Sequence, residues 1–422
     1  MLGLGVVGTG VYRILTERAD RLAARMDRPV YIARILVRNP NKPRQVTVPP
    51  GILTTDPRSV LDDPAIAVII EALGGEYPAV DFLRRALENG KYVITANKEV
   101  MAKHGPELLR LAAQHGVDIS FEASVGGGIP LIGAFRQDLA ANRIVGVQAI
   151  LNGTTNYILS RMADEGVDYP SALREAQRLG YAEPDSHNDV AGIDAAYKLA
   201  ILSTLAFQTP VRPGDIYTEG IEHLAPSDIR SGQEMGYRLK LLCSAVETEQ
   251  GVLARVHPAL LPRQHPLAQV DGVYNAVLVK GDLVGDVLFY GRGAGSEPTG
   301  SAMVADLVAL GQGIDTGTSP RLPVQLGDSR PGVPMSSLQT RYYLRMDVAD
   351  RPGVLAQLAG VLGDAGISIS SVIQKEANGA TGSAQIVIMT HPAREGAMQQ
   401  ARADLIALPV VREIAGFVRV EQ

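Results

Sequence analysis

The glycine-rich start of the chain is the feature that most restricts its fold. Gly3-Leu-Gly-Val-Val-Gly8 has the spacing GxGxxG and runs into the apolar segment Val11–Leu15. The first glycines permit a tight turn and a close approach to a pyrophosphate, and the third permits close packing of helix on strand. A plain flexible loop is the alternative for a lone motif. The motif predicts a dinucleotide site made by Gly3, Gly5, Val6, Val7 and Gly8.

Alternating strand and helix patterns follow this motif. We predict strands at 30–37, 67–73, 91–95 and 117–121, with a helix at 77–89. This alternation predicts a parallel, doubly wound α/β sheet of the Rossmann type. Only Met1 and Leu2 precede Gly3, so the first strand has almost no residues. We therefore expect a late start or a trimmed chain, and a weakened domain.

Polar residues follow two of the predicted strands. An enzyme that prefers NAD usually has an acidic residue after its second strand, whereas this chain has Arg38. A guanidinium there can bind a 2′-phosphate, so we predict a preference for NADP, with NAD possible. Thr95-Ala-Asn-Lys98 ends a later strand. Because ligands of such sheets bind beyond the carboxyl ends of the strands, we expect Lys98 to contact cofactor or substrate.

Two short polar segments suggest further ligand contacts. Glu122-Ala-Ser-Val-Gly-Gly-Gly-Ile-Pro130 has a backbone free enough to bring several carbonyls together around a sodium ion, although a hinge between domains is equally compatible. Asn152-Gly-Thr-Thr-Asn156 follows a strand at 145–151 and begins a helix. These residues are ordinary capping groups, and Thr154 is also a donor suited to a substrate carboxylate or phosphate.

An acid-rich segment, 180–198, lies in the middle of the chain. It contains Glu183, Asp185, Asp189 and Asp194, followed by Lys198. Asp194 and Lys198 are four residues apart on a predicted apolar helix and therefore share one face. They are either an exposed ion pair, or a site in which the acids hold an ammonium group while Lys198 faces a reacting oxygen.

Composition excludes several classes of function. The only cysteine, Cys243, lies in an apolar run and is expected to be buried, which argues against disulfides, CxxC zinc sites and thioester-forming aldehyde dehydrogenases. His187 is expected in a loop. The net charge is −5 and no basic run occurs, so nucleic acid is not expected as a partner. No apolar run is long enough to span a membrane and no signal peptide is evident, so we expect a cytoplasmic protein.

The order of these motifs resembles that of homoserine dehydrogenases. The resemblance is carried by Gly3–Gly8, Thr95–Lys98, Glu122–Pro130, Asn152–Asn156, Gly180-Tyr-Ala-Glu183, Asp189–Lys198 and Gly291-Arg-Gly-Ala-Gly295, and extends to about residue 320. It implies NAD(P)H-dependent interconversion of L-aspartate 4-semialdehyde and L-homoserine, on the route to threonine, methionine and isoleucine. It also implies a Rossmann domain at 1–121 and an α+β catalytic and dimerisation domain at 122–320, whose end returns to the first domain.

The resemblance assigns roles to individual residues. Lys198 would exchange the proton at the substrate oxygen, with Lys98 as a second functional lysine near substrate and cofactor. The remaining roles are substrate binding by Glu183, Asp194, Asp189 and Thr154, cofactor contact by Thr95, Gly180 and Gly295, and a sodium site of Glu122 with the carbonyls of Val125, Gly127 and Ile129. An ammonium can stabilise the negative oxygen that forms when hydride reaches an aldehyde. Because contact with Asp194 would oppose a lowered lysine pKa, we expect Asp194 to point to the substrate ammonium instead.

The last part of the chain has a different pattern. After a linker at 321–340, residues 341–422 show the order βαββαβ of a ferredoxin-like domain, with a hairpin turn at Asn378-Gly379. The Asp350-Arg-Pro-Gly353 turn resembles that of ACT domains. This implies L-threonine as a feedback inhibitor, with Gly353 near the effector, and a homodimer or homotetramer. The alternative is a dimerisation module that has lost its ligand.

Two other functions remain open at this stage. A nucleotide-binding sensor without turnover would not need a proton-transferring lysine beside substrate-gripping acids. A different semialdehyde dehydrogenase is disfavoured because no second cysteine can act as a nucleophile.

Overall fold

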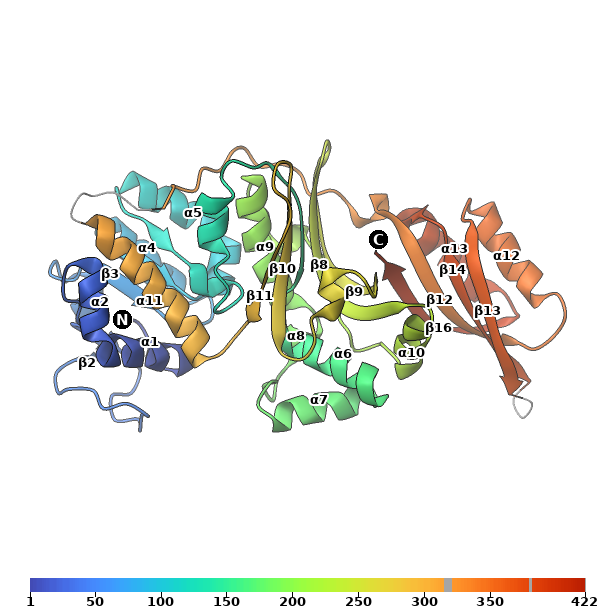
Figure 1. Cartoon of the computed structure of the whole chain (residues 1–422), viewed down its shortest axis with the longest axis horizontal. Helices are drawn as coiled ribbons and strands as arrows, with labels where there is room; N and C mark the ends of the chain where they lie inside the picture. The colour runs from blue at the N-terminus through green and yellow to red at the C-terminus, as the bar shows by residue number, and fades with distance from the viewer. Residues whose placement is uncertain (315–320, 379–381, 422) are drawn as a thin grey trace.

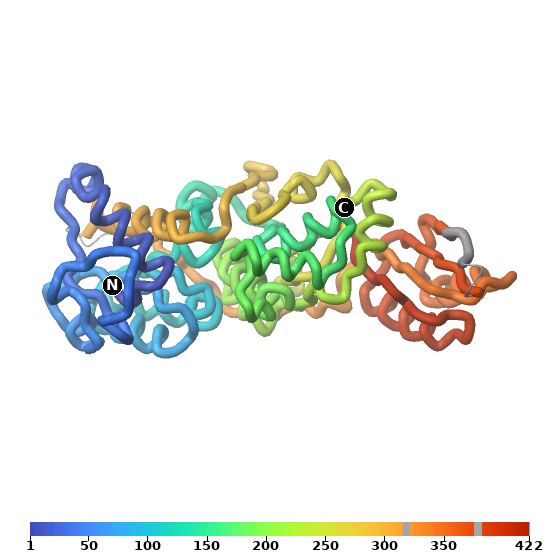
Figure 2. The backbone as a smooth tube through the Cα atoms, turned by 90° about the horizontal axis from the view of Figure 1, so that it is seen from below, coloured from blue at the N-terminus to red at the C-terminus, as the bar shows by residue number. Residues whose placement is uncertain are grey.

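The computed structural model describes residues 1–314, 321–378 and 382–421. Three parts follow one another along the long axis of the molecule, from the N-terminal part through the middle to the C-terminal part (Figures 1 and 2). The predicted fold class is confirmed, with a Rossmann-type sheet, an α+β middle part and a ferredoxin-like C-terminal part.

The N-terminal part is built on a parallel sheet. Its order is β2–β1–Leu2–β3–β4–β5, because Leu2 bridges both Leu36 and Glu71. The strands are β1 (Ile35–Leu36), β2 (Leu53–Thr54), β3 (Val68–Glu71), β4 (Tyr92–Thr95) and β5 (Ile119–Ser120). The helices are α1 (Val6–Glu17), α2 (Ala19–Met26), α3 (Arg58–Leu61), α4 (Ala79–Glu88) and α5 (Lys98–Gln114).

The first two residues take the central position of this sheet. The Leu2 amide donates to the Ile70 carbonyl at 2.7 Å, and the Leu36 amide donates to the Met1 carbonyl at 2.9 Å. The predicted strand at 30–37 is therefore wrong in its first half, since only 35–36 are paired as strand. The Arg34 carbonyl accepts from the Met1 amino group at 2.7 Å, and residues 30–33 form no strand pairing in the described chain. Two residues nonetheless join the two halves of the sheet.

The middle part packs helices on one sheet that is antiparallel except for β7, which pairs in parallel with β9. Its strands are β6 (Ile144–Ile150), β7 (Tyr217–Thr218), β8 (Tyr237–Thr248), β9 (Gly251–Pro262), β10 (Tyr274–Gly281) and β11 (Gly285–Arg292). Its helices are α6 (Gly153–Glu165), α7 (Tyr169–Arg178), α8 (His187–Val190), α9 (Ile193–Phe207) and α10 (Pro226–Glu234). Short turns are η1 (Glu122–Ser124), η2 (Ala134–Asp138), η3 (Pro213–Asp215) and η4 (Pro266–Gln269). Helix α11 (Ser296–Gly313) then returns to the N-terminal part and packs on α1, as predicted (Figure 1).

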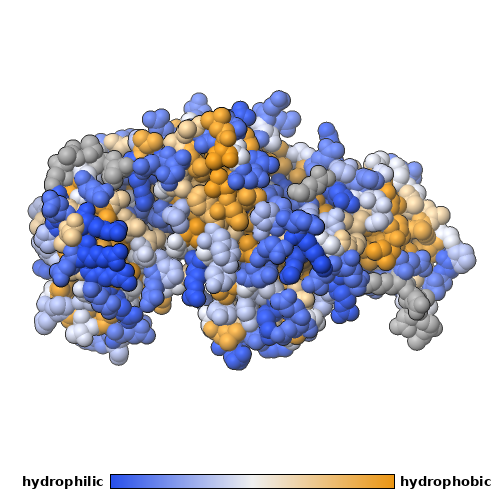
Figure 3. All heavy atoms as spheres, in the orientation of Figure 1, coloured by the Kyte–Doolittle hydropathy of each residue, from blue (hydrophilic) through white to orange (hydrophobic). Residues whose placement is uncertain are grey.

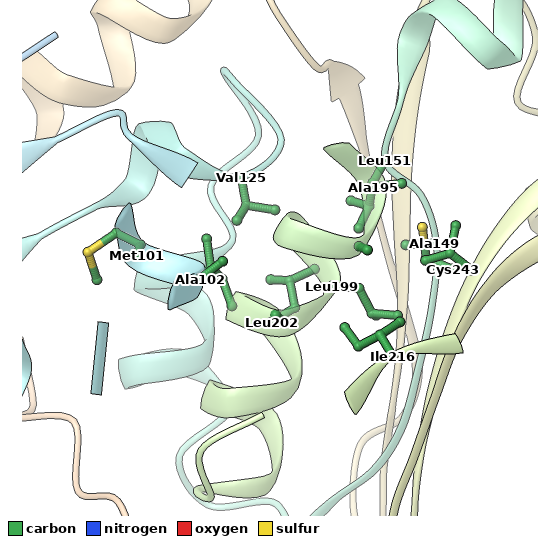
Figure 4. Close-up of a cluster of buried hydrophobic side chains, with 14 of the residues drawn as sticks. Met101, Ala102, Val125, Ala149, Leu151, Ala195, Leu199, Leu202, Ile216 and Cys243 are labelled. Atoms are coloured by element: carbon green, nitrogen blue, oxygen red, sulfur yellow. The ribbon is translucent and has the colours of Figure 1, made fainter. Parts of the chain in front are cut away.

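Helix α9 lies in the core of the middle part. Its apolar residues Leu199 and Leu202 lie between α5, which contributes Met101, and the sheet, which contributes Cys243 (Figure 4). A helix that is apolar on nearly all sides is stable only when it is covered on nearly all sides. Asp194 is accordingly only 3% exposed. The interpretation of Asp194 and Lys198 as an exposed surface pair is therefore wrong.

The C-terminal part has the predicted order βαββαβ with one short extra strand. Its elements are β12 (Gln339–Ala349), α12 (Val354–Asp364), β13 (Ile369–Asn378), β14 (Ser383–Thr390), β15 (Ala393–Arg394), α13 (Glu395–Ala407) and β16 (Val411–Val420), preceded by η6 (Met335–Ser337). The expected hairpin turn at 378–379 lies partly outside the described residues. Strand β16 pairs in parallel with β9, so a single sheet, with eleven strands among the described residues, runs from the middle part into this one. The sequence did not predict this junction.

The predicted linker is held against the middle part. The Gly327 amide donates to the Gln208 carbonyl at 2.8 Å, and Gly332 forms a parallel bridge with Val252. The Arg136 guanidinium donates to the Leu322 carbonyl at 2.8 Å. The described part of the linker is therefore a tethered irregular segment. No helix in the described ranges is both long and apolar enough to cross a membrane.

Candidate active site

A cavity of about 580 Å³ lies where the N-terminal and middle parts meet. Many of the site residues predicted from the sequence line this cavity. They are Lys98, Thr154, Gly180, Glu183, Asp189, Asp194, Lys198 and Gly295. They come from α5, the start of α6, the acid-rich segment, α9 and the loop before α11. The fold thus brings together residues that are up to about two hundred positions apart in the chain.

Asp194 forms the floor of this cavity between two lysines. One carboxylate oxygen contacts the Lys98 ammonium, and the other lies 2.6 Å from Lys198 Nζ. Lys198 Nζ also donates to the Leu151 carbonyl at 2.8 Å, which fixes its position at the end of β6. The Lys98 side chain is 44% exposed and that of Lys198 11%, so both ammonium groups border the cavity rather than the core.

Asn152 holds the acids in place. Its Nδ2 donates to Asp194 Oδ2 at 2.9 Å and to Asp189 Oδ1 at 2.7 Å. Its Oδ1 accepts from the Thr155 amide at 2.9 Å, which makes it the N-cap of α6 as expected. The sequence showed the cap but not the contacts with the two acids. Such contacts depend on how the start of α6 lies against α8 and the start of α9, which local pattern does not reveal.

The charges in the cavity stabilise one another. Burial alone would lower the pKa of Lys98, but Asp194, with help from Asp189 and Glu183, raises it. Burial acts to raise the pKa of Asp194, and the two lysines outweigh it and hold that pKa well below its usual range. The expectation that Asp194 avoids Lys198 is therefore wrong for the unliganded chain. No carboxylate other than Asp194 is within ion-pair distance of either lysine among the described residues.

The acid-rich segment is tied to the start of α6. Thr154 Oγ1 donates to the Tyr181 carbonyl at 2.7 Å, so its hydroxyl proton is already used within the chain. Glu183 is exposed at the mouth of the cavity, and Gly180 has a left-handed φ of +77°. His187 is exposed and begins the short helix α8, not a loop, and it does not line the cavity.

The N-terminal glycine loop has the geometry that a pyrophosphate site needs. Gly3 has φ +93°, and a Cβ there would lie 2.7 Å from the Ala72 carbonyl oxygen. A Cβ at Gly8 would lie 2.5 Å from the Gly3 oxygen, whereas nothing lies within 4 Å of one at Gly5. The loop is therefore closed toward the sheet and open toward solvent at Gly5, Val6 and Val7. Ser296 Oγ donates to the Val6 carbonyl at 2.8 Å and joins this loop to the segment of Gly295.

Arg38 and Thr95 lie outside the cavity in different environments. Arg38 is exposed two residues after the end of β1 and has no ion-pair partner within the described ranges. Thr95 is fully buried, and its hydroxyl contacts Glu71 while accepting from the Asn97 amide at 2.9 Å. The Thr95 side chain is thus engaged inside the sheet, and any cofactor contact by this residue would come from its backbone.

Asn275 is a cavity residue that sequence reasoning missed. It lies on β10, is 1% exposed, and neither atom of its amide has a hydrogen-bond partner in the described chain. It packs so closely on Gly293 that a Cβ there would lie 1.8 Å from Asn275 Oδ1. A buried amide without partners is unusual and marks a position where a ligand or a shift of the 293–295 loop would supply them. No local pattern distinguished this asparagine from an ordinary strand residue.

The glycine segment after Glu122 lies beside the same loop. The Glu122 carboxylate accepts from the amides of residues 131, 132 and 133 at 2.6, 2.7 and 2.8 Å. The carbonyls of Val125, Gly127 and Ile129 receive no hydrogen bond from the described part of the chain. Oxygen atoms of this kind can bind a hard cation, but the Glu122 side chain is already saturated by the chain itself. Among the described residues, no cluster of His, Cys, Asp and Glu side chains could hold a metal ion.

Cys243 is buried in β8, as predicted. It is 0% exposed, and burial raises the pKa of its thiol to about 12. A thiol in this environment is not a nucleophile. The chemistry of the cavity therefore depends on ammonium and carboxylate groups.

Comparison with known proteins gives matches along the whole chain. The family model described as homoserine dehydrogenase matches residues 130–308, and that of the homoserine dehydrogenase NAD-binding domain matches residues 3–122. The ACT domain model matches residues 342–410. The homoserine dehydrogenase of Synechocystis is 43% identical over 430 residues, with 100% of this chain and 98% of the relative covered. That of Pseudomonas aeruginosa is 44% identical over 426 residues, with the same coverage.

Solved structures agree with these matches. A homoserine dehydrogenase from Thiobacillus denitrificans superposes with a TM-score of 0.93 at 45% identity, covering 100% of this chain and 97% of that one. A putative homoserine dehydrogenase from Archaeoglobus fulgidus gives a TM-score of 0.65 at 32% identity, covering 73% of this chain and 97% of that one.

Proposed function

This chain belongs to the homoserine dehydrogenase family and carries an ACT domain, and on this premise we propose that it interconverts L-aspartate 4-semialdehyde and L-homoserine with NADP(H) in threonine, methionine and isoleucine biosynthesis. The observation that carries the proposal is the placement of Asp194 between Lys98 and Lys198 at the cavity floor. The test is NADP reduction on addition of L-homoserine, followed by absorbance. Binding of both ligands without turnover would favour the sensor hypothesis instead.

The residues of the cavity have different roles in the reaction. A nicotinamide nucleotide held by the Gly3–Gly8 loop would supply the hydride to the substrate carbon, or accept it in the reverse direction. Lys198, held by Asp194 and the Leu151 carbonyl, donates a proton to the carbonyl oxygen during reduction and accepts it from the hydroxyl during oxidation. Lys98 adds a second positive charge that stabilises negative charge on that oxygen. Glu183 and Asp189 bind the substrate ammonium, and Thr154 helps to orient the substrate. Asp194 holds the ammonium groups of both lysines in position.

The preference for NADP is assigned to Arg38. This proposal is supported by an exposed guanidinium that follows β1 and has no carboxylate partner in the described chain. A 2′-phosphate would provide one through charge-assisted hydrogen bonds. Replacing Arg38 with Ala should lower kcat/KM for NADP by about tenfold or more and leave that for NAD nearly unchanged. An equal loss with both cofactors would contradict this assignment.

A sodium ion is proposed at the carbonyls of Val125, Gly127 and Ile129. Support comes from their lack of hydrogen bonds and from the left-handed φ of +56° at Gly127, which packs this loop against Gly293. Glu122 would shape the loop through its contacts with residues 131–133 rather than bind the ion with its carboxylate. The melting temperature in sodium chloride should exceed that in choline chloride at equal ionic strength. Equal melting temperatures in the two salts would contradict the proposed sodium site.

A homodimer or homotetramer is proposed from exposed apolar surface. Figure 3 shows hydrophobic surface over the middle of the molecule and over the C-terminal part. On the β10–β11 hairpin Leu283 is 76% exposed and Tyr290 53%, and β11 is an edge strand. An uncovered edge strand with apolar side chains is a common pairing surface. Light scattering at the monomer mass would contradict the proposal.

Feedback inhibition by L-threonine is proposed through the C-terminal part. Support comes from the ACT domain and from its exposed turn, where Gly353 has φ +88° as the N-cap of α12. Threonine should lower the rate of homoserine oxidation in a saturable way. An unchanged rate would favour a dimerisation module without a ligand.

A further inference from the structure

A second cavity lies between the middle and C-terminal parts. It has a volume of about 390 Å³, at the small end of the roughly 300–1,000 Å³ typical of ligand pockets. Its charged and aromatic walls are Tyr217, Glu219, Glu395, Arg402, Phe417 and Arg419. It shares no lining residue with the active-site cavity, and it does not include the Asp350–Gly353 turn.

One of its two arginines is fully occupied by the protein. Arg419 is 1% exposed and is held by Glu395 at 2.5 and 2.9 Å and by Glu219 at 2.7 Å. Glu395 also accepts from Tyr342 and Gln399, so its oxygens are saturated. Glu219 retains capacity, because its second oxygen has only His223 at 3.3 Å and its side chain is 22% exposed.

The other arginine lacks an anionic partner. Arg402 lies over the Phe417 ring, with 5.0 Å between its guanidinium carbon and the ring centroid. Its Nε is buried and has no hydrogen-bond partner in the described chain, and no described carboxylate pairs with its guanidinium. A buried donor without an acceptor is costly, and a guanidinium in a concave wall is well suited to a carboxylate. The cavity therefore offers one unused cation and one partly unused carboxylate.

We propose that this junction cavity binds a small α-amino acid, with its carboxylate on Arg402 and its ammonium on Glu219. The formal charges of Glu219, Glu395, Arg402 and Arg419 cancel, so a zwitterion leaves the site neutral. A dianion such as a phosphate would meet the two carboxylates and is disfavoured. This site is distinct from the turn around Gly353, and its regulatory meaning rests on the function proposed above.

A ligand on Glu219 would act on the active site through a short backbone path. The Ile221 amide donates to the Val190 carbonyl at 2.9 Å, at the end of α8. A Cβ at Gly220 would lie 2.4 Å from the same oxygen, so the segment 219–221 is in direct backbone contact with α8. Helix α8 contains Asp189 and leads into Asp194. Movement of Glu219 toward a ligand ammonium therefore shifts the segment that positions the substrate-binding acids.

The test is binding to the full-length protein in the absence of substrate. Each protein amino acid is added in turn at about 10 mM, and the melting temperature is measured. At least one should raise it, and calorimetry then gives its affinity for wild type, Arg402→Gln and the matched control Arg351→Gln at the exposed turn. Arg402→Gln should weaken binding about tenfold or more through loss of a charge-assisted contact. Arg351→Gln should bind like wild type, and the methyl ester of the amino acid should not bind.

Three results would overturn this proposal. They are the absence of any stabilising amino acid, an unchanged affinity in Arg402→Gln, and loss of binding in Arg351→Gln, which would locate the ligand at the turn. Basal oxidation of L-homoserine without effector is measured in parallel and should be normal in Arg402→Gln. An inactive wild type that still binds the amino acid through Arg402 would contradict the proposed dehydrogenase function but not this site.

Discussion

Two charge clusters in this molecule have opposite compositions. At the active site one carboxylate, Asp194, contacts two lysines, whereas at the domain junction one guanidinium, Arg419, is shared by two carboxylates. The Lys98 side chain is 44% exposed to the cavity, whereas the Arg419 side chain is 1% exposed.

The difference separates a cluster that can react from one that holds the fold together. Arg419 uses its donors on Glu219, Glu395 and Tyr217, so no substrate could replace a partner without leaving a buried charge unpaired. Lys98 and Lys198 share one acid and border open space, so a substrate oxygen can take up their remaining donors. We infer that lysine donors left unpaired by the protein and bordering a cavity mark the reactive cluster.

The largest effect is expected at the shared acid. Asp194→Asn removes the charge that keeps both ammonium groups in place, and should lower kcat/KM for L-homoserine by about 10³-fold. Asp189→Asn is the matched control with a smaller loss, because Asp189 hydrogen-bonds to Asn152 and to neither lysine. Steady-state NADP reduction measures both. An equal loss of kcat/KM in the two variants would contradict the special role assigned to Asp194.

The junction cluster should affect stability instead. Arg419→Gln leaves the buried Glu395 and the half-buried Glu219 without their cation and should lower the free energy of unfolding by about 3–5 kcal/mol. Urea denaturation followed by circular dichroism measures this. Exposed Arg351→Gln serves as the control and should change it by less than about 0.5 kcal/mol. A wild-type urea midpoint for Arg419→Gln would contradict the structural role.

Substitutions of Asn152 distinguish its role in orienting Asp189 and Asp194 from its role as the N-cap of α6. Asn152→Ala removes the donors to Asp189 and Asp194, and the resulting misplacement should lower kcat/KM by about 10²-fold. Asn152→Asp retains an acceptor for the Thr155 amide, but it adds a third carboxylate beside two others and should be at least as damaging. Recovery of activity in Asn152→Asp would mean that only the helix cap matters.

The smallest effect is a pH dependence at the junction. Burial favours a raised pKa for Glu219, but His223, Arg419 and Tyr217 outweigh it and lower the pKa from 4.5 to about 2. Because the folded pKa is the lower one, this stabilisation is complete above the unfolded value and is lost as pH falls from about 4.5 toward 2. Glu219→Gln should therefore lose less stability than wild type on acidification in that range. Urea midpoints that change equally with pH in wild type and Glu219→Gln would contradict this prediction.

Local pattern was sufficient for much of the fold. The strand at 91–95 became β4 (Tyr92–Thr95), the helix at 77–89 became α4 (Ala79–Glu88), and the C-terminal order βαββαβ is present. These elements have clear periodicity and turn residues at their ends. Of the strand predicted at 30–37 only Ile35–Leu36 is paired, because pairing depends on neighbouring strands that a local pattern does not show.

The candidate site was predictable in its members but not in its contacts. Helical spacing paired Asp194 with Lys198, the family resemblance added Lys98, and all three lie at one cavity. The pairing of Asp194 with both lysines, the two donors from Asn152 and the buried amide of Asn275 depend on how distant elements pack. The joining of β9 to β16 is likewise a tertiary contact without a local signal.

Turnover in Lys198→Ala tests the central claim most directly. The account predicts that kcat for NADP reduction by L-homoserine falls by about 10²–10⁴-fold, the range for loss of a general acid–base group. The affinity for NADP, measured by quenching of cofactor or protein fluorescence, should remain that of the wild type. Near-normal kcat in this variant would contradict the account, because a group other than Lys198 would then transfer the proton.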